Sequence, residues 1–140
     1  MNVKRITGLL ALVFALAGCA TKVESLPLQA VTSRTQQQDV ALYFGAQPHP
    51  RVTVALGERK LSLRIARASE DPQESCNRAL ADAMQRLRAY ARELHGNAVI
   101  NIKTRFHTTE TASDTDYTCG VSPSAAAIAV RGDVVMLEGQ

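Results

Sequence analysis

Hydrophobic and polar positions divide the chain of 140 residues into three parts. Residues 6–17 form a nearly continuous apolar run that follows two cations. Residues 20–38 are polar and irregular, and no period of 2 or 3.6 persists through them, so we expect a flexible tether there. Regular patterns begin at residue 39, which predicts one folded domain over residues 39–140.

The clearest predicted element is an amphipathic helix over residues 72–94. Asp71 is a suitable N-cap, Pro72 suits the first helical position, and Glu74 completes a capping-box pattern. Apolar residues recur along this segment at intervals of three and four, as on one face of a helix. These residues are Ala79, Leu80, Ala83, Met84, Leu87, Tyr90, Ala91 and Leu94. We expect Gly96 to follow the helix as its C′ glycine.

Alternation of apolar and polar residues predicts the strands. Residues 40–44 are a short apolar run, typical of a buried strand. Residues 52–56 and 61–65 alternate on either side of a possible turn at 57–60, which favours a hairpin. Further strands are predicted at 100–106, 114–120 and 125–137.

Together these elements predict an α+β domain with one disulfide. Its architecture is one long amphipathic helix packed on a small, antiparallel-rich sheet of four to six strands. A domain of roughly 100 residues has a single core of modest size. A covalent crosslink would therefore add substantially to its stability.

The N-terminal region has the three-part plan of a secretory signal peptide over residues 1–18. Its apolar run is shorter than the roughly 20 residues that a membrane-spanning helix needs. The sequence Leu-Ala-Gly-Cys that ends at Cys19 resembles the bacterial lipobox, in which the cysteine is acylated and the signal peptide is cut before it. The resemblance implies a lipidated tether over 19–38, and Ala20 in place of aspartate implies the outer membrane, with the domain in the periplasm. The alternative is that Cys19 is an ordinary thiol after a plain signal peptide.

Charge and composition argue against nucleic acid as a partner. The formal net charge is +3, but two of the 16 basic residues, Lys4 and Arg5, precede the expected cleavage site, which leaves 14 basic and 13 acidic residues. A mature chain this close to neutrality has no electrostatic attraction for a polyanion as a whole. Aromatic residues make up 4% of the chain and tryptophan is absent, so stacking surfaces for bases are scarce.

Two cysteines, Cys76 and Cys119, remain after Cys19. An even number in an exported chain suggests a disulfide, which would close a loop of about 44 residues and stabilise the fold by roughly 4 kcal/mol. Zinc binding is the alternative, although no C-x-x-C or H-x-x-x-H motif is present. The three histidines, His49, His95 and His107, are scattered along the chain.

Motifs for catalysis are missing. The sequence has no nucleophile elbow, P-loop or dinucleotide-binding glycine pattern, so we predict neither an enzyme nor a bound cofactor. An acidic turn with Glu110, Asp114 and Asp116 is either solvated or a calcium or general-acid site. The arginines of the predicted helix form either a solvated face or a basic face for phosphate groups of lipid or glycan. They are Arg78, Arg86, Arg88 and Arg92.

The span 76–131 resembles the folded domain of the outer-membrane lipoprotein sensor of the Rcs stress phosphorelay. The resemblance lies in the alanine-rich helix, Gly-Asn-Ala-Val-Ile-Asn-Ile at 96–102, Asp-Tyr-Thr-Cys at 116–119 and the closing Ala-Ile-Ala-Val-Arg-Gly strand. It implies a helix on a small sheet, with Cys76 and Cys119 bridged. The sensor's second disulfide has no counterpart, because this chain has no cysteine near Lys103 or Thr104.

Residues 39–137, including Leu-Tyr-Phe-Gly at 42–45 and His49-Pro50, resemble a family of small proteobacterial lipoproteins. Members of that family are sometimes labelled excinuclease ATPase subunits, a label that the missing P-loop and zinc cysteines argue against. We therefore expect a non-enzymatic interaction or envelope-stress-sensing module, anchored in the membrane by its lipid and bound to an envelope protein. The alternative is a small-molecule or metal-binding periplasmic module, monomeric or oligomeric.

Overall fold

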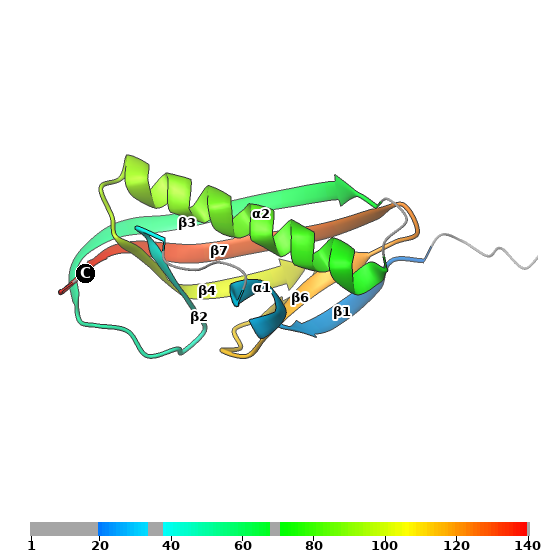
Figure 1. Ribbon diagram of the computed structural model, residues 1–140, viewed down its shortest axis with the longest axis horizontal. Helices are drawn as coiled ribbons and strands as arrows, with labels where there is room; N and C mark the ends of the chain where they lie inside the picture. The colour runs from blue at the N-terminus through cyan, green and yellow to red at the C-terminus, as the bar shows by residue number, and fades with distance from the viewer. Residues whose placement is uncertain (1–19, 34–37, 68–70, 140) are drawn as a thin grey trace, which may run out of the picture.

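The computed structural model describes residues 20–33, 38–67 and 71–139 (Figure 1). In chain order the elements are β1 (Lys22–Pro27), α1 (Gln29–Thr32), β2 (Ala41–Phe44), β3 (Val52–Ala66), α2 (Pro72–Glu93), β4 (Ala98–Phe106), β5 (Thr109–Thr111), β6 (Asp116–Val121) and β7 (Ala125–Leu137). All seven strands belong to one sheet, and α2 lies across one of its faces (Figure 1). The face that α2 covers is the inner face, and the opposite one is the outer face.

The central strand of the sheet is β7. It pairs antiparallel with β3 along one side, and with β4 and then β6 along the other side. Beyond β6 the sheet continues with β1, and beyond β4 it continues with β2, which is parallel to β4. The short strand β5 pairs with the end of β4.

The sheet is larger than the sequence predicts. It has seven strands instead of four to six, and α1 is a second helix, so the prediction of one long helix on a small sheet is wrong. One unpredicted strand is β5, whose three residues, Thr-Glu-Thr, are all polar. No hydrophobic pattern can mark such a strand, because it is held by backbone pairing with β4 and not by burial.

Part of the expected tether belongs to the folded domain. Residues 22–32 form β1, which pairs with β6, and α1. Leu28 and Val31 are each only 2% exposed, and Leu26 packs against the core. The prediction of a flexible segment is therefore wrong over residues 22–32. The alternation that would reveal a strand is weak, because Leu26 is the sole apolar residue on the inward side of β1.

The hairpin expected between residues 52–56 and 61–65 is instead one continuous strand, β3. Its pairing with β7 has two register shifts, between Val52 and Val54 and between Ala55 and Gly57. Gly57 has a φ of 113°, a backbone conformation that glycine adopts without strain. The glycine thus marks a β-bulge, and the strand follows β7 without turning back.

The start of α2 is confirmed, whereas the way it ends differs from the prediction. The Asp71 carboxylate accepts a hydrogen bond from the backbone N–H of Glu74 at 2.9 Å, which caps the helix. At the other end His95, and not Gly96, adopts a positive φ, of 60°. Gly96 is needed for space, because a Cβ there would lie 2.7 Å from the side chain of Val134.

The main core lies between α2 and the inner face, and the predicted disulfide is part of it. Side chains such as Leu80, Leu87 and Ile102 are fully buried there. A smaller cluster around Val135 and Leu137 is separate from the main core. Cys76 in the first turns of α2 and Cys119 on β6 form a disulfide with 6.0 Å between their Cα atoms, and neither residue is exposed. The predicted bridge is confirmed, and it joins the start of the helix to the sheet.

Candidate functional site

The outer face presents ordered rows of side chains. Residues opposite one another in antiparallel strands carry their side chains on the same face of the sheet. The pairing of β3, β7, β4 and β6 therefore arranges the outer face in rows that cross the strands. Three successive rows are Lys60 with Arg131 and Lys103, Ser62 with Ala129 and Arg105, and Arg64 with Ala127 and Gly120.

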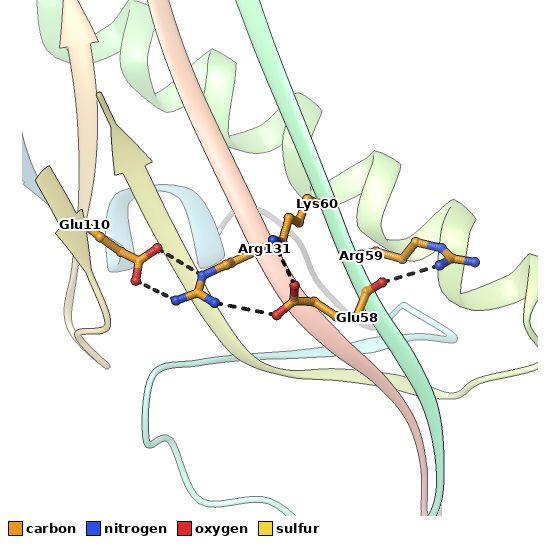
Figure 2. A network of polar contacts seen from close by, with 5 residues as sticks. All are labelled: Glu58, Arg59, Lys60, Glu110 and Arg131. Atoms are coloured by element: carbon orange, nitrogen blue, oxygen red, sulfur yellow. Dashed lines mark hydrogen bonds and ion pairs between the residues drawn. The ribbon is translucent and has the colours of Figure 1, made fainter. Parts of the chain in front are cut away.

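The first row places three cations on neighbouring strands, an unfavourable arrangement unless carboxylates offset it. The Arg131 guanidinium donates hydrogen bonds of 2.7 and 2.9 Å to the two carboxylate oxygens of Glu110, and lies 3.5 Å from Glu58 (Figure 2). The Lys60 ammonium lies 3.3 Å from the same Glu58 carboxylate. The role of β5 is thus to bring Glu110 to Arg131.

This network shifts the protonation of its members. The hydrogen bond from Arg131 holds the pKa of Glu110 below its ordinary value of 4.5, against a smaller opposing effect of burial. The Glu110 carboxylate in turn raises the pKa of Arg131. Because the folded-state pKa of Glu110 is lowered, its stabilising contribution is fully present above the ordinary value and is lost as the pH falls through the folded-state value.

Replacing Glu110 by Gln is expected to lower the free energy of unfolding at pH 7, since the three cations then lose one of their two shared carboxylates. The difference from wild type should shrink below pH 4.5 and vanish once Glu110 is protonated in both the folded and the unfolded chain. Urea unfolding at pH 7 and at pH values below 4 measures this. Glu93→Gln, on the exposed side of α2, is the control. A Glu110→Gln difference that persists unchanged at low pH would contradict the ion-pair explanation.

The second and third rows form the floor of a shallow hollow of about 450 Å³ on the outer face. The floor is low because its residues, Ser62, Ala127 and Ala129, have small side chains. Arg64 on β3 and Arg105 on β4 stand on either side of it. The backbones of these two strands lie roughly 10 Å apart, with β7 between them.

The lining of the hollow is cationic. Of the residues that line it, two are arginines, one is His107, and none carries a carboxylate. Arg64 and Arg105 are exposed, and neither guanidinium makes a hydrogen bond or close ion pair within the part of the chain that the structure describes. Glu110, opposite Arg105 on β5, interacts with Arg105 at longer range and binds Arg131 instead. A guanidinium group is always charged and presents a planar fork of donors that matches phosphate and carboxylate. The geometry therefore suits an anionic group held between the two arginines.

Apolar side chains border the hollow. The ring of Phe106 lies over Gly120, in the space that a Cβ at this position would need, and stacks edge-on against His107 with 4.1 Å between ring centroids. Val23, the partner of Gly120 on β1, is 49% exposed on the same face. The absence of a side chain at Gly120 is thus what lets Phe106 sit beside the hollow.

Most residues singled out in the sequence lie elsewhere. Cys19 and the signal peptide over 1–18 are outside the described residues. Cys76 and Cys119 are bonded to each other, and no group of three or more His, Cys, Asp or Glu side chains within 20–33, 38–67 and 71–139 could hold a metal ion. In that part of the chain no helix has the length and apolarity that crossing a membrane requires.

The structure separates charges that the sequence grouped together. Of the predicted acidic turn, Glu110 is bound to Arg131. Of the helix arginines, Arg92 donates hydrogen bonds of 2.7 and 2.8 Å to the Asp39 carboxylate, and Arg88 is buried with its Nε donating to a main-chain carbonyl. The helix arginines therefore do not share one exposed basic face.

Sequence reasoning does not identify the hollow. Alternation over 61–65 and over 100–106 predicts correctly that Arg64 and Arg105 face water. The hydrophobic pattern does not reveal the order of the strands in the sheet. The strand between β3 and β4 is β7, which comes last in the chain. The signal that could have helped is the alanine repeat at 125–129, whose small residues leave space on the outer face.

Comparison with known proteins does not assign a family. No family model matches the chain, and no curated protein matches it. The fold has some similarity to the crystal structure of a protein of unknown function from Pediococcus pentosaceus ATCC 25745, which belongs to the DUF74 family. That match has a TM-score of 0.47 and 17% sequence identity, and covers 73% of this chain and 100% of the other. Similarity at this level says nothing about function.

Proposed function

We propose that this chain is a non-enzymatic protein of the bacterial envelope, anchored to the outer membrane by lipid on Cys19, whose periplasmic domain binds an anionic partner in the hollow on its outer face. The observation that carries the binding role is the pair of unpaired arginines, Arg64 and Arg105, above a floor of small residues with no carboxylate in the lining. The proposed location is supported by the Leu-Ala-Gly-Cys sequence that ends at Cys19.

The chemistry of the lining supports binding over catalysis. Guanidinium groups keep their proton throughout the physiological pH range, so they attract anions but do not serve as general acids or bases. The hollow is open and shallow, which suits a charged group presented on a larger surface more than a small molecule enclosed on all sides. The partner we expect therefore carries phosphate or carboxylate groups at its surface.

A phosphate-bearing cation exchanger tests the binding role. The mature chain with Cys19→Ser and both Arg64→Ser and Arg105→Ser should leave phosphocellulose at clearly lower salt than the chain with Cys19→Ser alone. The matched control is Arg51→Ser with Arg86→Ser, which removes the same charge from exposed positions outside the hollow. If both double variants elute at the same salt concentration, only net charge matters and the binding site is refuted.

Fractionation of cells tests the anchor. Cys19→Ser should abolish acylation, and the protein should leave the outer-membrane fraction, because one or more acyl chains are then absent. Mass spectrometry of the wild-type protein extracted from membranes should show the added mass of the lipid on the peptide that begins at Cys19. A Cys19→Ser protein that remains in the outer membrane at full abundance would contradict the proposal.

A further inference from the structure

The hollow lies at the end of the domain where the chain enters the fold. Val23, near the start of β1, is in register with Gly120, which pairs with Ala127, which pairs with Arg64. This row crosses four adjacent strands, so roughly 15 Å separates the backbones of Val23 and Arg64. Figure 1 shows the start of β1 and the end of β3 at the same end of the sheet.

The proposed anchor is close to the same end. Cys19 precedes Lys22, the first residue of β1, by three residues, a segment that spans at most roughly 11 Å. A lipid on Cys19 therefore holds this end of the domain at the membrane surface. The flexible tether of 19 residues that the sequence predicts would have let the domain move freely relative to the membrane. Because β1 begins at Lys22, only a short connection remains between Cys19 and the fold.

Carboxylates and arginines are distributed unevenly along the outer face. Two carboxylates of the outer face, Glu58 and Asp133, lie beyond the row of Arg131, away from the start of β1. The third, Glu110, is opposite Arg105, but its carboxylate binds Arg131. The row of Arg64 holds no carboxylate, and the one carboxylate in the row of Arg105, Glu110, is already engaged by Arg131.

Two apolar side chains of the outer face are at the same end. Val23 is 49% exposed, and the half-buried ring of Phe106 borders the hollow. Apolar side chains next to arginines are typical of protein surfaces that rest on anionic lipid, where apolar contact and electrostatic attraction add.

We propose that this part of the outer face lies against the membrane that carries the anchor, and that Arg64 and Arg105 bind the phosphate groups of its lipid headgroups. The inference rests on the proposed lipid anchor at Cys19 and names the partner of the hollow. Charge complementarity supports a phosphate surface, and the short connection from Cys19 supports the membrane as its source. Anchoring keeps the headgroups at a high effective concentration, so weak individual contacts suffice.

Sedimentation with lipid vesicles tests this contact. The probe is the mature chain with Cys19→Ser, which lacks acyl chains, mixed with vesicles of phosphatidylcholine alone or of phosphatidylcholine with phosphatidylglycerol. We expect binding to the vesicles that contain phosphatidylglycerol, weakened by salt, and little binding to phosphatidylcholine alone. Adding Arg64→Ser and Arg105→Ser should lower the partition coefficient roughly 10- to 30-fold, since each basic residue near an anionic membrane contributes about fivefold or slightly less. Adding Val23→Ser should give a smaller loss.

Other outcomes separate this inference from the proposed function. Equal loss of vesicle binding in the Arg51→Ser, Arg86→Ser control would overturn the contact, as would equal binding to both kinds of vesicle. Displacement from vesicles by millimolar glycerol 1-phosphate would identify a soluble phosphate compound as the ligand instead of the membrane. If vesicles are not bound while phosphocellulose still distinguishes the two double variants, the membrane contact is wrong and an anionic protein or glycan partner remains.

Discussion

A chain in which alanine replaces both Cys76 and Cys119 is expected to have a free energy of unfolding about 4 kcal/mol lower than the oxidised wild type. The disulfide joins residues 43 positions apart, so it removes the entropy of a long loop from the unfolded chain. Domains of this size have a total stability of roughly 5 to 15 kcal/mol, so the variant should lose a large share of it and melt at a clearly lower temperature.

Urea unfolding followed by circular dichroism measures this loss. Wild type with its disulfide reduced is the matched control and should resemble the double alanine variant, because both lack the crosslink. Both sulfur atoms are buried beneath α2, so reduction should be slow until the domain opens. A double variant as stable as the oxidised wild type would show that the crosslink contributes nothing to the fold.

A chain that begins at Asp39, where the sequence pattern places the start of the domain, is expected to lose roughly 3 to 6 kcal/mol relative to one that begins at Ala20. The shorter chain lacks Leu28 and Val31, which are both 2% exposed, and each such side chain contributes about 1.5 to 3 kcal/mol when buried. It also lacks β1, so the free edge of β6 is exposed to solvent.

Thermal and urea unfolding of the two chains measure the difference. A chain that begins at Ala20 with Leu28→Ala and Val31→Ala separates the two contributions, because it keeps the pairing of β1 with β6 but loses most of the apolar burial. It should fall between the other two in stability. Equal stability of the chains that begin at Ala20 and at Asp39 would mean that residues 20–33 do not contribute to the fold.

The parts of the fold that the sequence predicts are those with local signals. The cap at Asp71 and the apolar stripe are contained within α2, so its position is predicted almost to the residue. The disulfide is predicted because the sequence leads us to expect export, and Cys76 and Cys119 are the two cysteines that follow Cys19. Both predictions can be made without knowledge of which strands are neighbours in the sheet.

The remaining features depend on contacts between distant segments. The strand β1 is stabilised by pairing with β6, about 95 positions later in the chain, and by a few buried side chains, so its own sequence resembles a linker. A glycine such as Gly57 is common both in turns and in β-bulges. It lies in a bulge here because β3 pairs with β7 on both sides of it. The hollow likewise exists because β7 brings Ala127 and Ala129 between two arginines.

The strand β3, with its 15 residues, is a long edge strand, and such an edge affects how copies of a protein interact. Within the described part of the chain, β7 is the one strand that pairs with β3, so the other border of β3 carries backbone donors and acceptors that no strand uses. Such borders invite other chains to add strands, which leads to aggregation. Here the two irregularities near Gly57 and the charges of Glu58, Arg59 and Lys60 make the border a poor template, so we expect crowded copies to resist edge-to-edge pairing.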